Sequence, residues 1–331
     1  MPISVVVVMR DAPMRPPVVV AIGGYGRSGS TLLQGLLAER LGGVALGEVK
    51  YLWSRGFARQ EKCSCGETAP DCPFWRPVLE ALLDKTGLSS AMEIERLRKS
   101  VERNRIFLRH EVLRLPSRSY ARRRQRYADI LGDLLILCGR RAGRDYLIDS
   151  SKDVAHLALL SGITRIRPKF IHLVRDSRAV AFSQKTPKKK AEVWWDTEYM
   201  AARGIWSSSG YWVYLNALMR RLDARGDYRV VRYEDLVAAP DATLTALVDW
   251  LRHGTHARVH DAALMHAISG NPGRFSTEAL ALSPDTRWHK AMSPFDRGAV
   301  TVMTAPWLHA YGYSLMGKQS APSAAPSDER P

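Results

Sequence analysis

The chain has 331 residues, and its 49 Lys and Arg against 33 Asp and Glu give a formal net charge of +16. The composition, 46% hydrophobic and 25% charged, is that of a globular protein and excludes a disordered or low-complexity chain. The excess positive charge indicates an anionic partner, such as nucleic acid, a membrane surface or a phosphorylated small molecule. No apolar run approaches the roughly 20 residues of a membrane helix, so we expect no integral membrane segment. The four valines at 5–8 are too few for a secretory signal, so we expect a cytoplasmic protein.

One central region lies between two tails. Residues 1–16 are predicted to be an N-terminal tail, and residues 318–331, rich in Ser, Ala and Pro, a disordered C-terminal tail. Across residues 17–317, short apolar runs alternate with helical patterns, which predicts an α/β fold with a central parallel sheet and helices on both faces. Residues 74–143 are predicted to form a mainly helical, Arg-rich insertion beside the sheet.

Five short apolar runs are the predicted strands. They lack strict alternation of apolar and polar residues, as expected of strands that are covered on both faces. These runs are residues 18–22, 44–46, 146–148, 170–174 and 228–232. Helical patterns begin near Thr31, Val154, Ala179 and Ala242.

A glycine-rich loop, GGYGRSGST, connects the first predicted strand to an apolar helical pattern. Such a connection binds phosphate, because glycines let the backbone approach the anion and the helix N-terminus adds positive potential. Gly24 and Gly29 have the spacing of the nucleotide-triphosphatase loop, but Ser30 stands where that loop carries its lysine. The cation is instead Arg27, so we predict a loop that binds phosphate and is poorly equipped for γ-phosphoryl transfer. The alternative is a glycine-rich turn that binds nothing.

The segment GYGRSGSTLL resembles the 5′-phosphosulfate loop of sulfotransferases that use 3′-phosphoadenosine 5′-phosphosulfate (PAPS). A second motif of that family binds the 3′-phosphate with an arginine at a strand end and a serine eight residues later, and Arg175 and Ser183 have this separation. The alternative for Arg175 is a local ion pair with Asp176 that caps a helix. The resemblance implies a P-loop-like three-layer fold in which the 5′-phosphosulfate is held by Arg27, Ser28, Gly29, Ser30 and Thr31.

Weaker similarities follow later in the chain. The segment VVRYEDLV is similar to a strand of the family in which the tyrosine, here Tyr233, lies near the nucleotide; Tyr233 could equally be a core aromatic residue. The segment GNPGRF resembles the late loop that closes over PAPS, with Arg274 as its candidate phosphate contact. The pair Arg287-Trp288 is similar to a basic residue and tryptophan near the end of such chains.

Glu48 and Lys152 are the candidate catalytic residues, together with Arg27. Gly47-Glu48 resembles a segment of the branch that includes tyrosylprotein sulfotransferases, where the glutamate is the base. Lys152 ends the segment DSSK, where family members place a lysine or histidine, and with Arg27 it is expected to stabilise charge on the leaving phosphate. The alternatives are a surface or ion-paired glutamate and a solvated lysine. The resemblance implies sulfuryl transfer from PAPS to a hydroxyl or amine, with no metal required.

Two other features have simpler interpretations. Cys63, Cys65 and Cys72 could bind zinc or form a local disulfide, but no histidine nearby in the sequence completes four ligands, so we expect reduced structural thiols and no metal site. The Arg-rich segment 103–126 is interpreted as a solvated helical face, or one that binds an acidic acceptor, and not as a nucleic-acid site.

Two other functions remain as alternatives, a P-loop kinase or NTPase and a basic nucleic-acid-binding protein. The absent loop lysine argues against the first, and the lack of a recognised nucleic-acid motif argues against the second. The acceptor, whether a small molecule, glycan, lipid or peptide, and the oligomeric state stay open.

Overall fold

The computed structural model describes residues 15–115, 117–185, 187, 193–194, 196–199, 202–225, 227–270 and 286–316. The predicted phosphate contact Arg274 and the predicted C-terminal tail lie outside these residues, as does all but the end of the predicted N-terminal tail. Among the described helices, none combines the length and the apolar character needed to cross a membrane.

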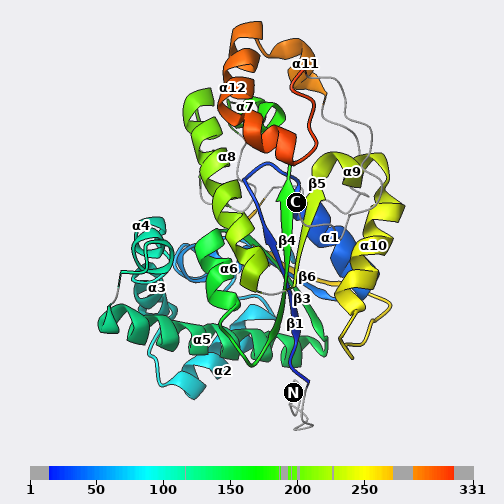
Figure 1. Ribbon diagram of the computed structural model, residues 1–331. Helices are drawn as coiled ribbons and strands as arrows, with labels where there is room; N and C mark the ends of the chain where they lie inside the picture. The colour runs from blue at the N-terminus through cyan, green and yellow to red at the C-terminus, as the bar shows by residue number, and fades with distance from the viewer. Residues whose placement is uncertain are drawn as a thin grey trace.

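A six-stranded sheet forms the centre of the molecule, and every pair of neighbouring strands is parallel (Figure 1). The strand order is β5-β4-β1-β3-β2-β6. The strands are β1 (Val18–Gly23), β2 (Val44–Gly47), β3 (Tyr146–Lys152), β4 (Arg167–Val174), β5 (Tyr228–Arg232) and β6 (Leu264–Ile268). All five predicted strands are confirmed, and the edge strand β6 is an addition to them.

Helices cover both faces of this sheet, as predicted. Each face of the sheet has its own hydrophobic core, and alternate residues of β1 belong to different cores. Val18, Val20 and Ile22 pack with one set of helices, whereas Val19 and Ala21 pack with the other. The first set is α1 (Ser30–Leu41), α9 (Tyr233–Ala238) and α10 (Pro240–Arg252), and the second includes α5 (Arg118–Ala142), α6 (Val154–Leu160) and α8 (Ile205–Met219). Because both faces are buried, apolar residues occupy successive strand positions and not every second one.

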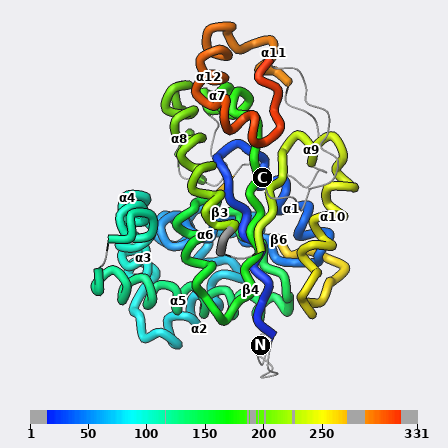
Figure 2. Tube along the Cα trace, in the orientation of Figure 1, coloured from blue at the N-terminus to red at the C-terminus, as the bar shows by residue number. Residues whose placement is uncertain are grey.

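The segment between β2 and β3 is mainly helical, as predicted. It begins with two short turns, η1 (Val49–Tyr51) and η2 (Leu52–Phe57), and continues as α2 (Trp75–Thr86), α3 (Ala91–Lys99), α4 (Asn104–Phe107), η3 (Leu108–Val112) and α5. Figure 2 shows these helices grouped at one side of the sheet. At the opposite end of the molecule, α7 (Ser177–Lys185) packs with α8, α11 (Arg287–Ala291) and α12 (Pro294–Ala310); η4 (Arg220–Arg225) precedes β5.

The strand order changes its direction of winding at β1. From β1 the chain crosses to β2, returns to β3 beside β1, and then continues to β4 on the other side of β1. Ligands of open α/β sheets bind beyond the carboxyl ends of strands where the direction of winding changes in this way. The glycine-rich loop leaves β1 at this point.

A buried ionic network attaches the helical insertion to the sheet. His156 of α6 is fully buried and lies between two carboxylates. Asp149 of β3 is 2.7 Å from its Nε2, and Glu102 is 2.7 Å from its Nδ1. Arg98 of α3 donates to Glu102 and pairs with Glu95. Burial lowers the pKa of His156, but the charges of Glu102 and Asp149 outweigh this effect and raise it to about 10. The network therefore contains an imidazolium at neutral pH.

This pKa predicts a loss of stability in alkaline solution. The folded-state pKa of His156, about 10, exceeds its ordinary value of 6.5, so its contribution is complete below the ordinary value and is lost as the pH rises toward 10. Between pH 6.5 and about pH 10, the free energy of unfolding measured with denaturant should fall by ~1.4 kcal/mol per pH unit. The control is His309→Gln, which replaces an exposed histidine of α12; its free energy of unfolding should fall with pH as that of the wild type does. A free energy that does not change across the window would contradict the assignment.

Candidate active site

Chemically active side chains follow five neighbouring strands at the carboxyl edge of the sheet. Because the strands are parallel, the segments after them meet at this one edge. The residues concerned are the loop after β1, Glu48 after β2, Lys152 at the end of β3, Arg175 after β4 and Tyr233 after β5. The predicted site residues within the described range thus come from one edge, apart from Ser183, which lies buried on α7.

The glycine-rich loop needs its glycines because other parts of the site pack directly against its backbone. Gly24 has φ of 135°, and a Cβ there would lie 2.3 Å from the carbonyl oxygen of Leu173. Gly29 has φ of 90°, and a Cβ there would lie 2.5 Å from the ring of Tyr233. Gly29 also caps α1 without a side-chain hydrogen bond, so backbone N–H groups of the first helical turn lie at the loop.

Arg27 and Ser28 provide buried donors in this loop. Nη1 of Arg27 and Oγ of Ser28 are buried and have no hydrogen-bond partner among the described residues. Arg27 also has φ of 72°, which is unusual for a residue other than glycine and is typical of a functional loop. Burial lowers the pKa of the Arg27 guanidinium. An anion bound at this position would supply the missing partners and offset the cost of burying the cation.

Arg175 joins the second motif to the first. Its Nη1 donates to the carbonyl oxygen of Arg27 at 2.7 Å, and its guanidinium lies 4.6 Å from the centre of the Tyr233 ring. From the following helix, Gln184 donates to the carbonyl oxygen of Gly26 at 3.4 Å. Tyr233 is therefore not a core aromatic residue: it is half-buried and packs between Arg175 and the start of α1.

The neighbouring Asp176 and Arg178 have a structural role. The two carboxylate oxygens of Asp176 accept hydrogen bonds from Arg178, with 2.9 Å to Nε and 2.7 Å to Nη2. Arg178 is buried, donates to the carbonyl oxygen of Ser314 at 2.8 Å, and lies 5.0 Å from the ring of Trp288. The tryptophan of the Arg287-Trp288 pair thus packs against α7, the helix that follows Arg175.

Glu48 and Lys152 form an ion pair between Oε1 and Nζ, across the adjacent strands β2 and β3. The two side chains are only 9% and 18% exposed, so neither is a solvated surface charge. Lys152 has φ of 64° and lies opposite Gly23 in the register of β1 and β3. Its backbone carbonyl oxygen accepts a hydrogen bond from the Gly24 N–H at 3.4 Å. The ion pair consequently lies beside the start of the glycine-rich loop.

A second ion pair, which the sequence did not predict, supports the first. Lys50 pairs with Asp153, and its backbone N–H donates to Ser151 Oγ at 3.0 Å. Burial alone would lower the pKa of Lys50, but the nearby charges of Asp153 and Glu102 raise it. Lys50 and Asp153 lie within two residues of Glu48 and Lys152, so the two strand ends are held together by paired charges of opposite sign.

Asp149 and Asp176 lie at strand ends, where a kinase or NTPase would hold a nucleotide-bound metal ion, but both are engaged elsewhere. Asp149 is fully buried and bonded to His156 and Ser151, and Asp176 is bonded to Arg178. With serine in place of the loop lysine, the described residues lack the usual equipment of a kinase or NTPase.

Comparison with known proteins identifies the family. The sequence model of the sulfotransferase family matches residues 17–255, which include both predicted phosphate motifs, Glu48 and Lys152. The chain belongs to the sulfotransferase family. This membership confirms the resemblance seen in the sequence, whereas the assignment to the branch with a glutamate base stays a prediction.

Two further comparisons complete this picture. No curated protein matches this sulfotransferase significantly. Among solved structures, it is similar to the sulfotransferase domain from the curacin biosynthetic pathway, with 18% identity, a TM-score of 0.46, and coverage of 91% of this chain and 99% of that chain.

Proposed function

We propose that this sulfotransferase uses PAPS as its donor and transfers the sulfuryl group to a hydroxyl or amine of an acceptor, releasing adenosine 3′,5′-bisphosphate. The observation that carries the proposal is the direct contact between the two phosphate motifs, in which Arg175 donates to the carbonyl oxygen of Arg27. Buried donors that lack a partner among the described residues lie on the loop side of this contact, at Arg27 and Ser28. A ligand with phosphate on both sides of an adenosine suits such a pair of motifs.

The roles of the binding residues follow from their places at the sheet edge. The loop residues Arg27, Ser28, Gly29, Ser30 and Thr31 would hold the 5′-phosphosulfate through backbone N–H groups, hydroxyls and one guanidinium. Arg175 and Ser183 would hold the 3′-phosphate, and Tyr233 would keep Arg175 oriented by packing on its guanidinium. Arg274, outside the described residues, would add a further phosphate contact.

The reaction forms a bond from the acceptor oxygen or nitrogen to sulfur while the bond from sulfur to the 5′-phosphate oxygen breaks. The acceptor loses a proton, which the Glu48 carboxylate would accept. Negative charge grows on the leaving phosphate, and the cations placed to stabilise it are Lys152 and Arg27. The contacts of Lys152 support this division of roles, since its side chain pairs with Glu48 while its backbone carbonyl contacts the loop at Gly24.

Arg175→Ala tests the 3′-phosphate site. Wild-type protein should bind adenosine 3′,5′-bisphosphate more tightly than 5′-AMP in calorimetry, and the variant should lose about tenfold or more of this preference, because a hydrogen bond to a charged group is removed. Arg40→Ala is the matched control, because Arg40 lies at the far end of α1 and is exposed. An unchanged preference in Arg175→Ala would sink the assignment.

Glu48→Gln tests the base. The amide has the size of the carboxylate but cannot accept the acceptor proton, so release of adenosine 3′,5′-bisphosphate from PAPS with a phenol as acceptor should slow by about 10²–10⁴-fold. Binding of the bisphosphate should stay near that of the wild type. Glu39→Gln, at an exposed position of α1, should turn over normally. Wild-type turnover in Glu48→Gln would remove this residue from the mechanism.

A further inference from the structure

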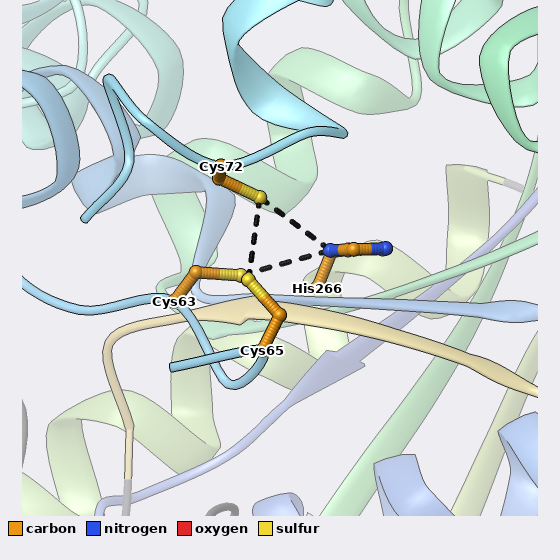
Figure 3. A group of neighbouring side chains, drawn as sticks. All are labelled: Cys63, Cys65, Cys72 and His266. Atoms are coloured by element: carbon orange, nitrogen blue, oxygen red, sulfur yellow. Dashed lines mark hydrogen bonds between the residues drawn. The ribbon is translucent and has the colours of Figure 1, made fainter. Parts of the chain in front are cut away.

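Three cysteines and one histidine come together away from the phosphate loop. Cys63, Cys65 and Cys72 belong to the segment between η2 and α2, and His266 belongs to the edge strand β6. One potential ligand atom of each residue lies within 4.8 Å of the other three. Figure 3 shows the four side chains pointing toward one another. Nothing in the sequence links His266 to Cys63 and Cys72, which precede it by 203 and 194 residues.

Three of the six distances between the potential ligand atoms are close to the edges of a tetrahedron around zinc. Zn–S bonds of about 2.3 Å and Zn–N bonds of about 2.0–2.1 Å place two sulfurs about 3.8 Å apart and a sulfur and a nitrogen about 3.5 Å apart. The observed distances are 3.5 Å between the sulfurs of Cys65 and Cys72, 3.5 Å from Cys72 Sγ to His266 Nδ1, and 3.8 Å from Cys63 Sγ to the same nitrogen. A disulfide would require about 2.05 Å between the sulfurs.

The backbone around the cluster holds these side chains in place. Gly66, with φ of 98°, completes a tight turn in which its N–H donates to the carbonyl oxygen of Cys63 at 2.9 Å, and this turn brings Cys63 and Cys65 to the same side. The ring of Phe74 stacks on His266 with 4.6 Å between centres and 8° between planes, and Trp75 donates to the carbonyl oxygen of His266 at 2.7 Å. The imidazole orientation is therefore fixed by packing.

We propose that Cys63, Cys65, Cys72 and His266 bind one zinc ion through three thiolates and the imidazole Nδ1. Because four protein ligands complete the tetrahedron, the ion has no open position for a substrate, and its role is structural. This site replaces the expectation of reduced thiols without a metal. It is independent of the proposed donor, since none of its four ligands is among the residues proposed to bind the donor.

The zinc ion would fasten the segment before α2 to the short edge strand β6. The same segment already pairs with β6 through an antiparallel β-bridge between Cys63 and Ile268. The backbone N–H of Ser64 also donates to the carbonyl oxygen of Ala267 at 3.0 Å. The carbonyl oxygen of Ile268 in turn accepts the backbone N–H of Glu48 at 2.8 Å. The metal site thus stabilises the strand that positions the candidate base.

Metal analysis of the full-length protein, expressed with zinc in the medium and purified without chelator, tests this proposal. We expect about one zinc per chain. Cys65→Ser, which changes the exposed ligand, and His266→Gln should lose zinc to a chelator that leaves the wild type loaded. Cys138→Ala changes a cysteine of α5 outside the cluster and should keep the metal.

Two measurements on wild-type protein decide the matter even if the variants fail to fold. Cobalt(II) added to metal-depleted protein should give the intense visible absorption of a tetrahedral thiolate site, and thiol titration after denaturation in chelator should find all four cysteines reduced. Protein without zinc and without this cobalt spectrum would overturn the proposal. So would a Cys65–Cys72 disulfide, seen as the loss of two titratable thiols.

Discussion

The parallel arrangement of the sheet, with β1 between β3 and β4, is the constraint on which the site depends. It brings the carboxyl ends of all six strands to one edge, so that short segments far apart in sequence meet there. The pairing of Gly23 with Lys152 fixes the lysine beside the glycine-rich loop, and the pairing of β1 with β4 brings Arg175 within hydrogen-bond distance of the same loop. A one-residue slip in either register would separate these groups.

Buried charges hold the strand ends in this arrangement. Glu48 and Lys152 are paired, Lys50 and Asp153 are paired beside them, and Asp149 continues through His156 into the helical insertion. Such pairs add little net stability, because both partners lose their hydration, but breaking one of them is costly. Their effect is to define one geometry for a site whose proposed chemistry uses a base and cations within a small space.

Sequence reasoning found the parts of this site that depend on local pattern. A glycine-rich loop after an apolar strand, or an arginine at a strand end with a serine two helical turns later, is visible because the residues are close in the chain. The contacts that needed long-range folding were missed. His266 was not linked to the cysteines, since β6 has only five residues and a histidine interrupts its apolar run. The network of Asp149, His156 and Glu102 was missed for the same reason: its members come from separate elements.

The central claim is that one donor bridges the phosphate loop and Arg175. A crystal structure of the protein with adenosine 3′,5′-bisphosphate tests it most directly. The account predicts the 5′-phosphate against the backbone N–H groups of residues 28–31 and the guanidinium of Arg27, with the 3′-phosphate on Arg175 and Ser183. A bisphosphate bound with neither phosphate on the loop, or with its 3′-phosphate away from Arg175, would contradict it.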